Sequence, residues 1–224
     1  MVVALVCGSA AQAGRPLQTD DAGVLDRGAC EVEAFAARVS IASAAARKQN
    51  LQLGCGLGLS TQLALGTGAE RVESDRMQSL SLAGKTELWQ GPAAAGASHM
   101  LTFSYAVGWA RSSGQTWRHA SSDLKLIYSA PLASEFTVHA NVGSGRDEQT
   151  RRRNTSWGLA VEHGGWGTVS LMTEVFGDDR EPPWWNVGLR WAVLPDRWFA
   201  DFSYGRQVAG GRPRLLTLGS KLVF

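Results

Sequence analysis

Ionisable side chains recur at every second position in several segments of this 224-residue chain. Glu31 and Glu33 flank Val32, and Lys85 and Glu87 flank Thr86. Because side chains alternate between the two faces of a β-strand, this spacing gathers charge on one face. Acids and bases that share a face can line a pathway for a polar solute or pair with one another. The complete set is Glu31, Glu33, Lys85, Glu87, Lys125, His139, Glu162, Glu174, Arg190, Asp201 and Lys221.

Apolar residues occupy the opposite parity. Three rows stand out: Leu101, Phe103, Tyr105, Val107 and Trp109; Trp157, Leu159 and Val161; and Trp185, Val187, Leu189, Trp191 and Val193. A charge that faces lipid costs about 2–4 kcal/mol near the bilayer midplane, so rows facing lipid would place the charges inside a barrel. The core of a soluble β-sandwich or lipocalin-like barrel shows the same alternation. The nine tryptophans favour the membrane interpretation, since this side chain suits membrane interfaces.

The last eleven residues, R-L-L-T-L-G-S-K-L-V-F, alternate in the same way and end on Phe224. Lys221 interrupts the run, which is also shorter than the roughly 20 apolar residues of a helical span. The segment resembles the C-terminal strand of Gram-negative outer-membrane β-barrel proteins. The resemblance implies that Phe224 is an insertion signal and that the barrel-assembly machinery is a partner.

Alternation and turn residues indicate about twelve strands. They are expected near 30–40, 49–57, 62–70, 77–88, 99–110, 121–129, 136–144, 154–163, 167–176, 185–193, 198–205 and 214–224. Short connections alternate with longer charged ones, such as 71–76 and 146–153, as in outer-membrane barrels. The long connection at 90–98 breaks this rule, so ten or fourteen strands also fit. The sequence predicts an all-β, closed antiparallel transmembrane β-barrel with both termini periplasmic.

The chain before the first strand divides into two segments. Residues 1–13 are apolar and end in A-Q-A, which indicates a secretory signal peptide, although a basic start is missing and the segment is expected to be truncated. Residues 14–29 form a polar periplasmic leader, and the barrel covers 30–224. The leader is expected either as a loose tail or as a segment tucked into the barrel, with Asp20 and Asp21 meeting lumen cations.

Three motifs carry a more specific resemblance: the leader R-P-L-x-T-D-D-A, the first strand G-A-C-E-V-E-A-F and the hairpin G-x-x-x-x-L-x-L-G. Together they resemble a group of uncharacterised proteobacterial outer-membrane barrels related to the putative phenol-degradation-pathway transporter family. This resemblance implies a barrel exported to the cell outer membrane. It implies very little about a substrate.

The cysteines and a cluster of arginines can each be interpreted either as a specific site or as ordinary packed or solvated side chains. Cys30 and Cys55 would meet the oxidising periplasm at the same end of a hairpin, either as a disulfide or as two small packed thiols. Arg151, Arg152 and Arg153, with Arg146, would lie in an outer loop. There they would either face lipopolysaccharide phosphates, which arginine matches in geometry, or simply be solvated.

Other chemistry finds little support. His139 has Asn141 and Ser144 nearby, as a lipid hydrolase would need, but it points inward by parity and no activated serine motif accompanies it. No metal site or cofactor is indicated, because Asp178, Asp179 and Glu181 form only an acidic loop. A net charge of +2 gives no argument for nucleic acid.

The functional hypothesis is therefore a narrow channel or passive transporter for small solutes, with a charged lumen. The alternatives are a structural or lipid-contacting barrel with an occluded lumen and, last, an outer-membrane lipid hydrolase. The partners expected in every case are outer-membrane lipid and lipopolysaccharide. The sequence identifies no solute.

Overall fold

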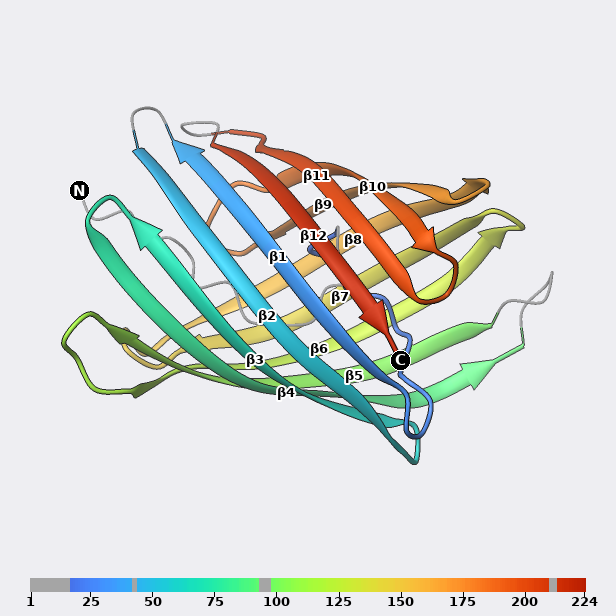
Figure 1. Ribbon diagram of the computed structural model, residues 1–224, viewed down its shortest axis with the longest axis horizontal. Helices are drawn as coiled ribbons and strands as arrows, with labels where there is room; N and C mark the ends of the chain where they lie inside the picture. The colour runs from blue at the N-terminus through green and yellow to red at the C-terminus, as the bar shows by residue number, and fades with distance from the viewer. Residues whose placement is uncertain (1–16, 42–43, 93–97, 210–212) are drawn as a thin grey trace.

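Twelve antiparallel strands form one closed barrel in the computed structural model of the chain (Figure 1). The structure describes residues 17–41, 44–92, 98–209 and 213–224. The strands are β1 (Cys30–Ile41), β2 (Ala44–Gly58), β3 (Thr61–Val72), β4 (Asp75–Gly91), β5 (His99–Ser112), β6 (Arg118–Ala133), β7 (Phe136–Asp147), β8 (Arg152–Trp166), β9 (Val169–Asp178), β10 (Trp184–Leu194), β11 (Trp198–Gln207) and β12 (Arg214–Val223).

The barrel closes where the first strand meets the last. β1 pairs with β12 from Glu31 opposite Val223 to Ser40 opposite Arg214, and every other strand pairs with its neighbours in sequence. Figure 1 shows this seam as the blue β1 beside the red β12. Closure leaves no strand edge unpaired, which is the condition for a sheet to lie in lipid. The predicted closed, all-β antiparallel barrel of about twelve strands is confirmed.

Most strands are longer than the sequence pattern predicted. Half of the predicted 146–153 loop is strand, since β7 runs to Asp147 and β8 begins at Arg152. The 71–76 loop is likewise a tight turn, with Glu73 at a φ of 52°. Backbone pairing does not depend on apolar side chains, so the ladders continue into charged residues beyond the apolar belt. Arg146, Arg152 and Arg153 therefore lie on strand ends, which corrects their predicted place in a loop.

The outside of the barrel is apolar. Leu65, Leu159, Trp191 and Leu218 are 63%, 53%, 53% and 58% exposed. Members of the predicted outward rows on β8 and β10, including Trp157, are exposed as well. Large apolar side chains arranged around a closed sheet form a surface suited to lipid. This arrangement contradicts the alternative in which the same rows pack into a water-soluble core. Across the described residues, no helix long and apolar enough to cross a membrane is present.

The inside of the barrel is polar and contains the leader. Of the leader, residues 17–29 are described, whereas the predicted signal peptide lies outside the described residues. At the end where β1 begins and β12 ends, Arg27 pairs with Gly56 of β2. At the far wall, Leu17 packs against Ala160 of β8 and Met172 of β9. The leader therefore crosses the lumen, and the loose-tail alternative is wrong.

Candidate functional site in the barrel lumen

A buried glutamate on β9 holds the beginning of the leader. The Glu174 carboxylate accepts hydrogen bonds from the backbone N–H of Gln18, at 2.8 and 3.0 Å, and of Thr19, at 2.7 Å. The Asn186 side-chain amide donates a further bond to it at 2.7 Å. Hydrogen bonds to an ionised acceptor are stronger than neutral ones. Glu174 is therefore an anchor for the leader rather than one half of an ion pair.

Neutral side chains bind the leader backbone further along. Asn141 of β7 accepts a hydrogen bond from the Asp20 N–H at 2.7 Å and donates one to the Asp20 carbonyl at 2.9 Å. Ser129 of β6 accepts from the Ala22 N–H at 2.8 Å, and Thr102 of β5 donates to the Ala22 carbonyl at 2.6 Å. The barrel wall thus supplies hydrogen-bond partners for the leader's backbone N–H and C=O groups, as a neighbouring strand would. Here the partners are side chains from three strands.

Two lumen lysines bind the leader's adjacent carboxylates. Lys125 Nζ forms a salt bridge with Asp20, whose side chain is fully buried. Lys85 Nζ donates a hydrogen bond to the Asp21 carbonyl at 2.8 Å and lies 4.0 Å from an Asp21 carboxylate oxygen. Asp20 and Asp21 therefore meet lumen cations, which is the tucked arrangement that the sequence allowed.

Two lumen glycines make room for the leader backbone. A Cβ at Gly56 would lie 2.1 Å from the Asp26 carbonyl oxygen and 2.4 Å from that of Leu25. A Cβ at Gly158 would lie 2.5 Å from Thr19 Oγ1. Real Cβ atoms do not approach other atoms this closely, so both contacts require glycine. The barrel wall is thus shaped to fit the leader at both ends of its path.

The remaining cations of the predicted lumen set pair within the barrel wall. Lys221 of β12 forms salt bridges with Glu31 and, at 3.4 Å, with Glu33, both on β1. Arg190 of β10 binds Asp201 of β11 through two hydrogen bonds of 2.8 and 3.3 Å. These pairs bridge neighbouring strands, including the closing seam. Lys221 also interacts electrostatically with Asp21 of the leader.

His139 lies buried in the lumen between Ser129 and Glu162. Its Nδ1 lies 2.8 Å from Ser129 Oγ, and its Nε2 lies 3.7 Å from a Glu162 carboxylate oxygen. Asn141 instead holds the leader, and Ser144, at odd separation from His139 on β7, takes the opposite face and is exposed. A lipid hydrolase would need its serine and histidine together on the lipid side, so the Ser-His-Asn set of the hydrolase alternative is not assembled here.

The rest of the predicted set lies away from the leader's path. Glu87 is half-buried next to the bulge between Glu87 and Trp89 of β4. Asp178 accepts hydrogen bonds from the backbone N–H of Arg180 and Glu181, so it caps its own turn. Within the described residues, no group of three or more His, Cys, Asp or Glu side chains is arranged to hold a metal ion.

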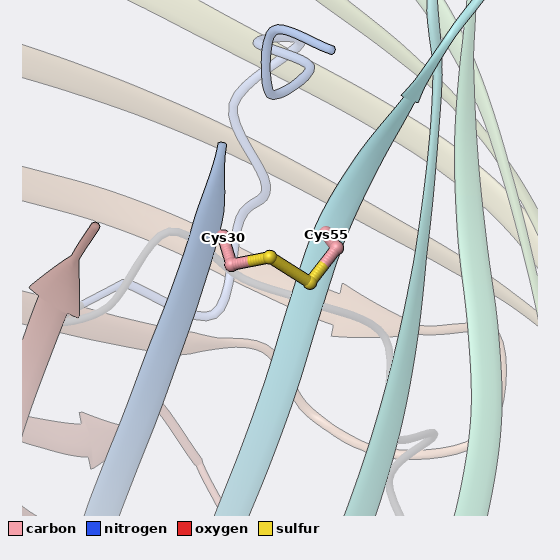
Figure 2. The surroundings of a disulfide bond; sticks show 2 residues. All are labelled: Cys30 and Cys55. Carbon is pink, nitrogen blue, oxygen red and sulfur yellow. A yellow bond between two sulfur atoms is a disulfide. The ribbon is translucent and has the colours of Figure 1, made fainter. Parts of the chain in front are cut away.

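The cysteines lie beside the closing seam, as Figure 2 shows. Cys30 and Cys55 are register partners on β1 and β2 and form a disulfide with an S–S distance of 2.12 Å. Cys30 also exchanges backbone hydrogen bonds of 2.7 and 2.8 Å with Phe224. One residue therefore links the first hairpin to the last strand, where the leader leaves the lumen.

The arginine cluster lies at the β7–β8 turn, at the end opposite Phe224. Arg146 forms a salt bridge of 3.2 Å with Glu148. Arg151 occupies the turn at a φ of 55°, and the Arg153 carbonyl accepts a hydrogen bond from Arg180 Nε at 2.8 Å. Part of the cluster is thus engaged with the protein itself.

The neutral side chains that bind the leader were missed by sequence reasoning. Gln62 of β3 accepts a hydrogen bond from the Leu25 N–H at 2.8 Å, and it acts alongside Thr102, Ser129 and Asn141. All share the lumen-facing parity of the charged set, which is the signal that would have found them. Because serine, threonine and amide residues are common on any polar face, parity alone does not single them out.

A closed barrel with an apolar belt, a charged lumen and an inserted leader defines an outer-membrane β-barrel fold. The chain belongs to the family described as "Uncharacterised conserved protein UCP029691", whose model matches residues 1–224. A comparison with curated protein sequences found no match.

Solved structures with a similar fold include three channels. The KdgM porin in complex with disordered oligogalacturonate has a TM-score of 0.62 and 9% identity, covering 87% of this chain and 99% of that chain. The NanC porin has a TM-score of 0.62 and 7% identity, covering 85% and 98%. The COG4313 outer membrane channel from Pseudomonas putida F1 has a TM-score of 0.61 and 14% identity, covering 93% and 100%. At these identities the likeness shows the fold.

Proposed function

We propose that this protein is a narrow outer-membrane channel for small solutes, with a lumen that its own leader constricts. The observation that carries the proposal is the inversion of polarity: the closed barrel is apolar outside, whereas its interior bears ion pairs and a hydrogen-bonded polar segment. Such an arrangement gives hydrated solutes a polar route across lipid. The same architecture in barrels described as porins and as an outer membrane channel supports this function.

The decisive test is conductance in planar lipid bilayers. Wild-type protein and a variant lacking residues 17–24 are compared, and heat-modifiable migration in gels verifies that both barrels are folded. We expect small unitary currents from the wild type and at least severalfold larger ones from the variant, because the deleted residues include most of the segment that crosses the bore. Glu162→Gln is the matched control, since Glu162 faces the lumen but approaches His139 rather than the leader.

The leader also favours a second candidate function, a structural or lipid-contacting barrel with an occluded lumen. The segment from Leu17 to Leu25 spans the interior and is hydrogen-bonded to β3, β5, β6, β7 and β9. If neither the wild type nor the shortened variant conducts, the channel proposal fails and this alternative stands.

The orientation is part of the proposal. The start of β1 and the end of β12 share one end with short turns such as the one at Leu59 and Ser60, which is the periplasmic pattern of outer-membrane barrels. A cysteine placed at Gln115, in the opposite connection, should react with an impermeant maleimide on intact cells. A cysteine at Asp196, in the β10–β11 turn at the same end as Phe224, should react only after the outer membrane is permeabilised. The reverse result would contradict the orientation.

The partners of the barrel are likewise proposals. Arg151, Arg152 and Arg153 lie at the expected outer end, where their guanidinium groups would bind lipopolysaccharide phosphates. Replacing all three with serine should lower retention of lipopolysaccharide during purification. An unchanged amount of lipopolysaccharide would mean that the three arginines are only solvated.

Phe224, hydrogen-bonded to the start of β1, is proposed as the insertion signal for the barrel-assembly machinery. The leader motif also supports a relation to the putative phenol-degradation-pathway barrels.

A further inference from the structure

The lumen cations fall into two groups according to their partners. Arg190 and Lys221 form salt bridges with carboxylates of the barrel wall. Among the salt bridges of the described residues, Lys85 and Lys125 pair only with the leader's Asp21 and Asp20. The salt bridges of Arg190 and Lys221 are therefore made within the wall, whereas those of Lys85 and Lys125 are made to the leader. Two weaker electrostatic interactions cross this division, between Lys221 and Asp21 and between Lys125 and Asp123 of the wall.

Departure of the leader would leave these two lysines without their carboxylates. Lys85 is 3% exposed, and an unpaired ammonium at such a buried site is unfavourable. On β9, Glu174 would at the same time lose the two backbone N–H groups that it binds. The vacated site thus presents cations on β4 and β6 and a hydrogen-bond acceptor on β9.

We infer that this site binds short acidic peptides, and that the leader is a tethered competitor for them. The segment Gln18 to Asp21 shows the match directly: its first two residues donate N–H groups to Glu174, and its last two place carboxylates at Lys125 and Lys85. A free peptide with the same order of N–H donors and carboxylates can make the same contacts. The inference rests on the proposed channel function and specifies the solute class for that lumen.

One acidic wall residue limits the site. Asp123 lines the same small cavity as Lys125, so its carboxylate opposes a second anion there. Neutralising Asp123 should therefore strengthen the binding of an acidic peptide, whereas it should not affect a neutral one. This opposite sign makes Asp123→Asn a useful companion to substitutions of the lysines.

The binding test uses two capped tetrapeptides and purified protein in detergent. The probe is acetyl-Gln-Thr-Asp-Asp-amide, and the control is acetyl-Gln-Thr-Asn-Asn-amide. The hosts are the wild type, the full-length Asp20→Asn/Asp21→Asn variant and the variant lacking residues 17–24, with isothermal titration calorimetry as the readout. We expect the acidic probe to bind the shortened variant at least tenfold more tightly than the wild type, with the full-length variant between them. The control peptide should bind at least tenfold more weakly than the probe.

Substitutions of the two lysines decide whether this binding uses the proposed site. Lys85→Met/Lys125→Met in the shortened variant should reduce affinity for the acidic probe at least tenfold, and Asp123→Asn should raise it. Equal affinity for the two peptides would overturn the inference even if the barrel conducts ions. An affinity for the acidic probe that the lysine substitutions leave unchanged would do the same. Lysine-dependent binding without conductance in any variant would instead retain the peptide site and overturn the channel.

Discussion

Replacing Glu174 with glutamine should release the N-terminal part of the leader. The substitution keeps the size of the side chain but removes its charge and turns one acceptor oxygen into an N–H₂ donor. That donor would face the backbone N–H groups of Gln18 and Thr19, which now lie 2.7–3.0 Å from the carboxylate. The leader would therefore lose hydrogen bonds and gain an unfavourable donor–donor contact.

The size of the effect follows from the contacts. Hydrogen bonds to a charged group contribute about 1.5–3 kcal/mol each, and the carboxylate of Glu174 holds two leader amides. Water can enter a polar lumen and restore part of this loss, so we expect the lower end of the sum, about 3 kcal/mol. At tenfold for every 1.4 kcal/mol, the docked population of this segment should fall by roughly two orders of magnitude relative to the undocked one.

Hydrogen–deuterium exchange measures this equilibrium directly. The peptide that contains Gln18 and Thr19 should exchange roughly 100-fold faster in Glu174→Gln than in the wild type. Peptides from β9 and β10 should keep their protection. Glu162→Gln is the matched control, because Glu162 also faces the lumen but approaches His139 rather than the leader. Unchanged exchange in Glu174→Gln, or equal acceleration in both variants, would refute the assignment of Glu174 as the anchor.

Three further predictions test the disulfide, the contact between the wall and the leader, and the ion pairs at the closing seam. Cys30→Ser/Cys55→Ser removes a link across 25 residues, worth about 3 kcal/mol, so reductant should lower the unfolding temperature of the wild type but not of this variant. Gly56→Ala forces a methyl group against a leader carbonyl and should expose the leader to protease. Gly54→Ala, with its nearest neighbour at 3.5 Å, should leave it protected. Lys221→Met removes the cation that Glu31 and Glu33 share at the seam, costs about 3–5 kcal/mol and should lower the temperature at which heat-modifiable migration is lost.

The fold could be predicted from the sequence because lipid and lumen impose opposite demands on successive residues. In β10, Trp185, Val187, Leu189 and Trp191 alternate with lumen-facing positions, and all four are exposed on the outside. The alternation of apolar and polar residues no longer marks a strand beyond the membrane, because both faces of the sheet meet water there. The strand ends were accordingly underestimated, and β2 begins at Ala44 rather than near residue 49.

Parity predicted which charges face inward but not their partners. Glu33 and Lys221 are register partners across the seam, and that register depends on how the barrel closes. Lys125 pairs with a residue 105 positions away in a segment without any periodicity. Ile127 departs from the rule altogether: it shares the lumen-facing parity of Lys125 yet is apolar and fully buried. Tertiary packing around the leader decides such positions, and a strand pattern carries no information about it.

The contacts that hold the leader also constrain any solute that replaces it. Thr102, Ser129, Asn141 and Glu174 are all less than 10% exposed, and each has its polar atoms bonded to leader backbone. An apolar solute would leave these buried groups unsatisfied, at about 1–3 kcal/mol each. A solute that brings its own donors and acceptors would restore them. Replacing the leader therefore costs little free energy for a polar, peptide-like molecule and much more for a hydrocarbon. The neutral side chains thus favour polar solutes, and the charged side chains then select among those solutes by charge.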